Sequence, residues 1–195
     1  STSTSTNIDS SIQMIDMASE QKICNAVLRL VDDSSNDVQA IAVKTLGVLV
    51  TTVHEDQVVG IAQKLGALVL DESKSALRDV YAIGLRTLVK TVPINTGDIV
   101  SSKISAELMD GIRIRAKDIK DMSAASTKEE RDKSKVAEEI TLACLEILTD
   151  LLTRFGSLPV ISRQHETLLE VILAQLASNS HLIRKRAGNT IGCLA

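Results

Sequence analysis

The densest group of side chains able to do chemistry is a basic run near the end of the chain. Arg184, Lys185 and Arg186 follow one another at the start of an expected helix. Three cations there could receive an acidic partner or a phosphate group, or one arginine could bond the carbonyls or acids of a neighbouring turn. Arg78 has the equivalent position in an earlier helix, where the first helix pair carries Gln39. Both interpretations stay open at this point.

The other reactive groups are not arranged as a catalytic or metal site. Adjacent carboxylates occur at 129–130 and 138–139, but neighbours on a helix point to different faces, so solvation is the simpler interpretation. The cysteines and histidines are scattered without zinc-type spacing, and the cysteines indicate reduced, buried thiols: Cys24, Cys144, Cys193, His54, His165 and His181. The motifs GxSxG, GxxxxGK[ST], HExxH and GxGxxG are missing. We therefore expect no enzyme, no metal and no cofactor.

The composition narrows the class of partner. The 195 residues include one Tyr, one Phe and no Trp, which disfavours proteins that stack nucleobases on aromatic side chains. The formal net charge is −3, so no basic excess exists to neutralise a phosphate backbone. The sequence has no run of 18 apolar residues, the length a membrane helix needs. We expect a protein partner, with neither nucleic acid nor membrane.

Helical periodicity runs along nearly the whole chain, and no window alternates with the period of a strand. Eight helices are expected, among them one near 19–31, one opening at Asp37, one ending before Pro93 and one near 98–117. Ser19 and Asp37 are the expected N-caps of the first two. The buried stripes expected in these two helices are Ile23, Ala26, Val27 and Leu30, then Val38, Ile41, Ala42, Leu46, Leu49 and Val53.

The second helices of successive pairs match one another in sequence. Their anchors Val38, Leu77, Ile140 and Ile183 are spaced 39, 63 and 43 residues apart, and HEAT and armadillo repeats have roughly 40–47 residues. The excess in the middle spacing corresponds to the charged segment 118–135, expected to be an inserted mobile loop. The prediction is an all-α HEAT-repeat superhelix, an α-solenoid of about four helix pairs. The array spans 19–195, after an N-terminal segment 1–18 that is a flexible tail or a remnant helix, with repeats near 19–53, 54–93, 98–156 and 162–195.

Several blocks of this array resemble a known family. Four blocks follow one another along the chain: Asp37-Val38-Gln39 with Ala42-Val43-Lys44, Leu77-Arg78-Asp79 with Ile83-Gly84-Leu85, Leu145-Glu146-Ile147-Leu148, and Ile183-Arg184-Lys185-Arg186. In this order they resemble N-terminal HEAT repeats of the cullin-associated, neddylation-dissociated proteins, also called Cand or TBP-interacting proteins. The apolar end of the chain leads us to expect a second polypeptide or further repeats C-terminal to Ala195.

The resemblance implies a non-catalytic scaffold. Members of the family bind the unmodified cullin–RING core at the cullin C-terminal region, block neddylation and promote exchange of substrate-receptor adaptors of SCF-type ubiquitin ligases, in cytoplasm and nucleus. The implied partners are a cullin and its RING subunit. We expect Gln39, Arg78, Arg184 and Lys185 to face the cullin from the concave side of the array. The alternative is a generic HEAT-repeat scaffold, of the phosphatase-scaffold or transport-adaptor type, unrelated to cullins.

Overall fold

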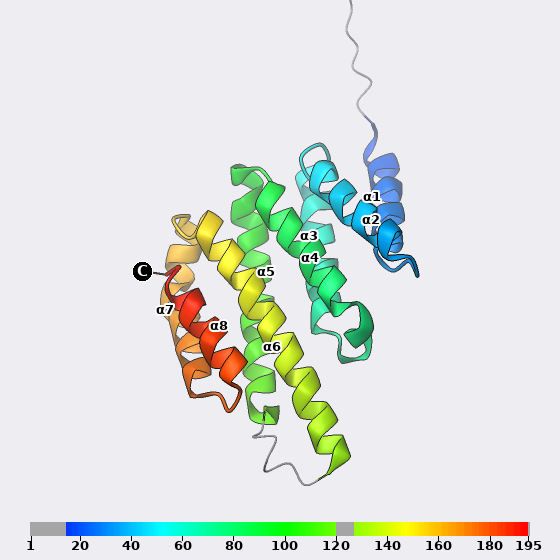
Figure 1. Ribbon diagram of the computed structural model, residues 1–195. Coiled ribbons are helices and arrows are strands. Elements are labelled where there is room, and N and C mark those ends of the chain that lie inside the picture. Colours follow the sequence, from blue (N-terminus) through cyan, green and yellow to red (C-terminus); the bar gives the residue numbers. More distant parts are fainter. Residues whose placement is uncertain (1–14, 120–126, 195) are drawn as a thin grey trace, which may run out of the picture.

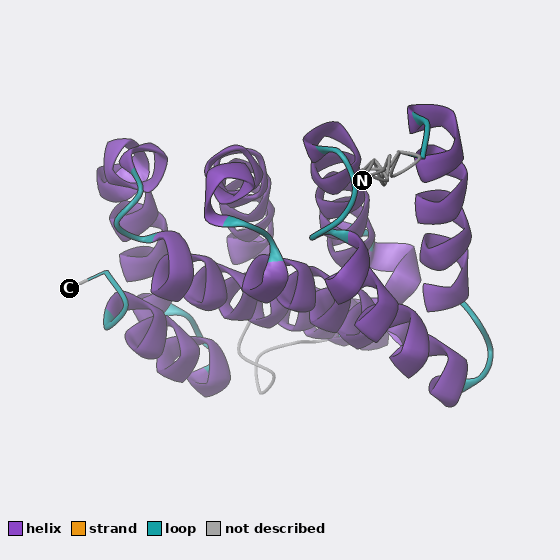
Figure 2. Ribbon diagram, turned by 90° about the horizontal axis from the view of Figure 1, so that it is seen from above, coloured by secondary structure: helices purple, strands orange, loops and turns teal. Residues whose placement is uncertain are grey.

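The computed structural model describes residues 15–119 and 127–194, which form two layers of helices (Figures 1 and 2). Within these two ranges there is no strand, and the predicted all-α solenoid is confirmed. The helices are α1 (Met17–Val31), α2 (Asn36–Leu49), α3 (Glu55–Leu70), α4 (Arg78–Thr91), α5 (Ile94–Arg115), α6 (Lys128–Phe155), α7 (Pro159–Ala174) and α8 (His181–Ile191), with short 3-10 turns η1 (Glu72–Leu77), η2 (Ala116–Asp118) and η3 (Gln175–Ala177).

The layers follow the alternation of helices along the chain. α2 packs on α4, α4 on α6 and α6 on α8, while α1, α3, α5 and α7 form the other layer. In Figure 1 the second helices α2, α4, α6 and α8 lie side by side at the front, and in Figure 2 the two layers are seen from above. The second helices therefore share one continuous surface. Two helices begin earlier than predicted, α5 directly after Pro93 and α7 at Pro159, because proline fits the first turn of a helix.

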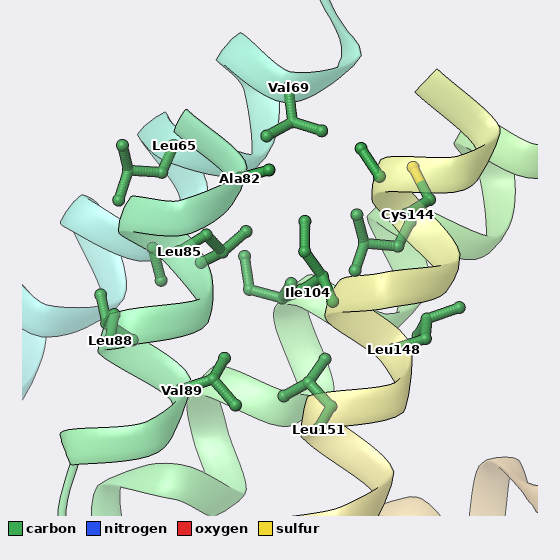
Figure 3. Packing of buried hydrophobic residues seen from close by; sticks show 14 of the residues in the cluster. Leu65, Val69, Ala82, Leu85, Leu88, Val89, Ile104, Cys144, Leu148 and Leu151 are labelled. Carbon is green, nitrogen blue, oxygen red and sulfur yellow. The ribbon is translucent and has the colours of Figure 1, made fainter. Parts of the chain in front are cut away.

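An aliphatic core fills the space between the layers. Figure 3 shows buried side chains of four helices, among them Leu65 of α3, Ile104 of α5 and Cys144 of α6, with Val89 of α4 and Leu151 of α6 pointing toward each other. Burial raises the pKa of the Cys144 thiol to about 12, so this cysteine is an inert part of the packing. The prediction of buried thiols is confirmed for Cys24 and Cys144, whereas Cys193 is partly exposed.

The predicted buried face of α1 was wrong. Ile23, Ala26 and Leu30 are exposed, and only Val27 of the predicted stripe is buried. The side chains that face α2 and α3 instead are Cys24, Val27, Leu28 and Val31. In α2, Ile41 was also expected inside but is 64% exposed. Both errors fall on the first helix pair that the structure describes.

The N-caps of α1 and α2 also differ from the prediction. Asp16 caps α1, and its carboxylate accepts a hydrogen bond from the backbone N–H of Ser19 at 3.0 Å. Ser35 is the N-cap of α2, with Asp37 one residue inside the helix. A carboxylate in the first turn still favours the helix because it interacts with the helix dipole.

The charged segment 118–135 is only partly a connection. α6 begins at Lys128, where the Thr127 hydroxyl accepts a hydrogen bond from the N–H of Glu130 at 3.1 Å. Residues 128–135 are therefore helical and not loop, since the cap and the acidic first turn support a solvated helix end. Residues 120–126 and 1–14 lie outside the described residues, and with them the centre of the predicted loop and most of the predicted tail.

Candidate protein-binding surface

Arg78, one of the four predicted partner-binding residues, is enclosed in the fold. Its side chain is 2% exposed. Nε donates to the carbonyl oxygen of Val69 at 3.2 Å and Nη2 to that of Asp71 at 3.1 Å, while Nη1 pairs with Glu139 of α6 at 3.0 Å. Arg78 thus closes the turn between α3 and α4 and joins α4 to α6.

Gln39 and Arg184 serve the turns before their own helices in the same way. Gln39 Nε2, in a residue 7% exposed, donates to the carbonyl oxygen of Asp33 at 2.6 Å. Arg184 Nη1 donates to the carbonyl oxygens of Ser178 at 2.6 Å and Asn179 at 3.1 Å. Carbonyl groups in such turns have no helical partner, so a side-chain donor satisfies them. The three equivalent positions therefore share a structural role, and a glutamine fills it as well as an arginine.

Lys185, the fourth predicted residue, is presented to solvent. Its ammonium makes no ion pair among the residues that the structure describes. With Leu182, Arg186 and Asn189 it lines an open groove of about 390 Å³ between α6 and α8. Leu182 is 46% exposed at this groove. An exposed aliphatic side chain beside an unpaired cation suits a protein partner with an apolar and an acidic residue.

A network of ion pairs that was not predicted from the sequence crosses the second helices α4, α6 and α8; we call it the interhelical ladder. Arg86 Nε of α4 lies 2.6 Å from an Asp150 oxygen and its Nη1 3.1 Å from a Glu146 oxygen of α6. Lys90 also approaches Asp150, at 3.4 Å, and Arg186 of α8 pairs with Glu146 from the other side. The sequence signal was present, since Arg86 and Lys90, and Glu146 and Asp150, are each four residues apart on one helix face.

We expect Asp150→Ala to lower the free energy of unfolding by about 1 kcal/mol, because the Arg86–Asp150 pair is only partly exposed and shared with Lys90. Urea unfolding at low and high salt measures the loss, which should shrink as salt screens the remaining charges. The matched control is Asp110→Ala, which removes the exposed Asp110–Arg113 pair at 3.6 Å within α5 and should change little. Equal effects of the two substitutions would contradict a structural role for the ladder.

The groove between α2 and α4 is apolar and carries no such pair. Gly47 of α2 has the repeat position of Arg86 (86 − 47 = 39), so no cation can reach across from there. The groove measures about 390 Å³ and is lined by Asn36, Gln39, Ala40, Val43, Lys44, Val80 and Ile83. Ile83 is 52% exposed and Lys44 is exposed on its rim. We call the outer face of α2, α4, α6 and α8, whose exposed residues include Lys44, Ile83, Leu182 and Lys185, the second-helix surface.

Residues 15–119 and 127–194 offer neither a metal site nor a membrane helix. They hold no group of three or more His, Cys, Asp or Glu side chains placed to bind a metal ion. None of the helices in residues 15–119 and 127–194 combines the length and the apolar character needed to cross a bilayer.

Comparison with known proteins relates this chain to one set of relatives. No protein-family model matches the sequence. The chain is 35% identical over 173 residues to cullin-associated NEDD8-dissociated protein 1 of Drosophila melanogaster, a match over 89% of this chain. It is 35% identical over 186 residues to cullin-associated NEDD8-dissociated protein 2 of Mus musculus. It is 29% identical over 181 residues to cullin-associated NEDD8-dissociated protein 1 of Arabidopsis thaliana. It spans only 12% to 13% of the length of these relatives. The predicted resemblance is confirmed, and the chain belongs to the family of the cullin-associated NEDD8-dissociated proteins.

Proposed function

We propose that this chain is a non-catalytic scaffold that binds the unmodified cullin–RING core at the cullin C-terminal region, blocks neddylation and promotes adaptor exchange. The observation that carries the proposal is the match, over about nine-tenths of the chain, to relatives named for their association with cullins. The second helices α2, α4, α6 and α8 pack side by side, and their continuous surface supports binding of a large protein partner. The cytoplasm and the nucleus are the proposed places of action.

The second-helix surface supports binding in physical terms. Ile83 and Leu182 are half-exposed aliphatic side chains over two different grooves, and burying such anchors contributes most of the affinity of an interface. Lys44 and Lys185 stand beside them with no ion pair in the described part of the chain, so acidic residues of the partner would find counter-charges there. Neddylation would be blocked by covering the acceptor region of the cullin, without chemistry by the scaffold.

The double variant Leu182→Asp/Lys185→Glu should weaken capture of a purified cullin–RING complex at least tenfold, about 1.4 kcal/mol of binding free energy. It removes an apolar anchor and reverses a charge, while both side chains stay in solvent, so helical content should not change. The matched control is Leu173→Asp/Arg163→Glu on α7, where Leu173 is 45% exposed against 46% for Leu182. Equal loss with both double variants would contradict the assignment of this surface.

A second comparison tests the identity of the partner. The same capture is made with neddylated and with unmodified cullin–RING complexes. Preference for the unmodified complex supports the proposal. Equal capture of both forms, or capture of neither, would instead favour the generic HEAT-repeat scaffold. Turnover of any substrate by the purified chain would contradict the non-catalytic part of the proposal.

A further inference from the structure

The grooves of the second-helix surface join into one continuous depression, which we call the furrow. The groove between α2 and α4 and the groove of about 420 Å³ between α4 and α6 share Ile83 as a lining residue. The groove between α4 and α6 shares Leu142 and Glu146 with the groove between α6 and α8. Each groove therefore continues into the next, and the furrow crosses the four second helices that lie side by side in Figure 1.

The furrow follows the repeat register. One position of the repeat lines it in all four second helices, with the spacings of 39, 63 and 43 residues that separate the repeat anchors: Ala40, Asp79, Leu142 and Lys185. The position one helical turn later lines it with the same spacings: Lys44, Ile83, Glu146 and Asn189. Two rows of equivalent side chains thus cross the array, and their chemistry decides what the furrow binds.

Three charged side chains of these rows have no ion pair within residues 15–119 and 127–194. They are Lys44 of α2, Asp79 of α4 and Lys185 of α8, and all three are exposed. Glu146 of α6, by contrast, pairs with Arg86 on one side and Arg186 on the other. From α2 to α8 the furrow therefore presents a positive, a negative and again a positive charge without a partner.

Apolar side chains lie between these charges. Ile83, which is 52% exposed, separates the first two grooves, and the partly exposed Leu142 separates the last two. Leu182, which is 46% exposed, lines the last groove. A partner gains by covering such apolar surface, and it must place opposite charges on the unpaired ones, because like charges in an interface cost binding free energy. The complementary chemistry is acidic, basic and acidic side chains in this order, with aliphatic residues between them.

We propose that the furrow binds one extended segment of a protein partner, whose acidic, basic and acidic side chains pair in turn with Lys44, Asp79 and Lys185. Aliphatic side chains between them pack on Ile83 and Leu142. Packed helices are about 8–10 Å apart, so the furrow is about 24–30 Å long from α2 to α8. An extended chain rises about 3.3 Å per residue and crosses this length with about eight or nine residues. The source of the segment, a cullin–RING complex, rests on the proposed function.

Asp79 distinguishes this proposal from a general attraction for acidic proteins. Asp79→Lys would leave three unpaired positive charges in the furrow. A partner with acidic residues alone would then bind more tightly, whereas a segment with a base at this place would meet a like charge. We therefore expect capture of the purified, unmodified cullin–RING complex to fall at least fivefold. Asp79→Asn, which only removes the charge, should weaken capture at least twofold.

The matched control is Asp56→Lys. Both aspartates are exposed and lie in the first turn of a helix, but Asp56 belongs to α3 in the other layer, away from the furrow. The two lysine variants change the net charge equally, and circular dichroism should show the same helical content for both. Asp56→Lys should leave capture unchanged. Equal or tighter capture by Asp79→Lys, or equal losses with both lysine variants, would overturn the proposal.

Synthetic peptides test the furrow without a cullin. Two fluorescent peptides of about ten residues contain the same two glutamates, one lysine and intervening leucines and serines. One has the order acid, base, acid, and the other has the order acid, acid, base. Fluorescence polarisation at low salt should show at least fivefold tighter binding of the first peptide, and Asp79→Lys should abolish this preference. Equal binding of the two peptides, or binding of neither, would overturn the furrow as a binding site, whereas peptide selectivity without cullin capture would contradict only the proposed function.

Discussion

Arg78→Ala is expected to lower the free energy of unfolding by about 3 kcal/mol. The guanidinium is almost fully buried and donates to the carbonyl oxygens of Val69 and Asp71. Alanine would leave both carbonyls without these donors and a cavity where the side chain lay. The pair with Glu139 adds little to this loss, since that carboxylate is 41% exposed and would turn to water.

Chemical unfolding followed by circular dichroism measures this loss. The control is Arg184→Ala, which removes the equivalent arginine of the last repeat. Because Arg184 is exposed, water can replace it at Ser178 and Asn179, and the loss should stay below about 1 kcal/mol. Arg78→Lys should not rescue, since an ammonium cannot reach two carbonyls as the planar fork does. Similar losses for Arg78→Ala and Arg184→Ala would show that burial is not the source of the effect.

The helices themselves could be predicted because their signals are local. Pro93 marks a helix end, and the structure ends α4 just before it, at Thr91. The choice of the face that α1 buries does not depend on local sequence signals. Apolar residues occur on two sides of this helix, and the neighbours decide that Cys24 and Leu28 are covered while Ile23 and Leu30 are not. A periodicity count cannot show which of two apolar sides the neighbouring helices cover.

The start of α6 carries a sequence signal for a helix N-terminus, but the high charge of the segment led to the prediction of a loop. Thr127 and Glu130 form the T-x-x-E pattern of a capping box, and Thr127 does cap the helix. The high charge of the surrounding residues favoured a loop. The first turns of α6 project into solvent, so a helix there needs no apolar stripe.

The roles of the candidate site residues depended on contacts far apart in the sequence. Arg78 and Lys185 are both basic residues at the start of second helices, yet one is enclosed and the other free. The difference lies in the preceding turn, where η1 brings carbonyl groups within reach of Arg78. The ladder between Arg86 and Asp150 likewise joins residues 64 positions apart, which only the packing of α4 on α6 reveals.

Phe155→Ala is expected to lower the free energy of unfolding by about 4 kcal/mol. Phe155 is 0% exposed at the end of α6, and its ring packs where Gly97 of α5 leaves room. The guanidinium of Arg154 lies 5.1 Å from the ring centroid and adds a cation–π contact. Alanine would remove the ring and leave a cavity between α5 and α6 that the backbone cannot close.

The contact with Gly97 provides a sharper test than the truncation alone. A Cβ on Gly97 would lie 2.4 Å from Cε1 and 2.7 Å from Cζ of Phe155, so Gly97→Ala should destabilise by about 2 kcal/mol. Leucine at 155 has no atoms at these ring positions, so Gly97→Ala should become nearly neutral in a Phe155→Leu background. A double-mutant cycle by urea unfolding should give a coupling above about 1 kcal/mol.

Gly60→Ala is the matched control for this cycle. Gly60 also lies inside a helix, α3, but a Cβ there would meet nothing within 4 Å. The substitution should therefore stabilise by up to about 1 kcal/mol, the intrinsic preference of a helix for alanine over glycine. Additive effects of Gly97→Ala and Phe155→Leu, or equal effects of Gly97→Ala and Gly60→Ala, would mean that the ring does not occupy the space above Gly97. In that case α5 and α6 would have to pack differently at this contact.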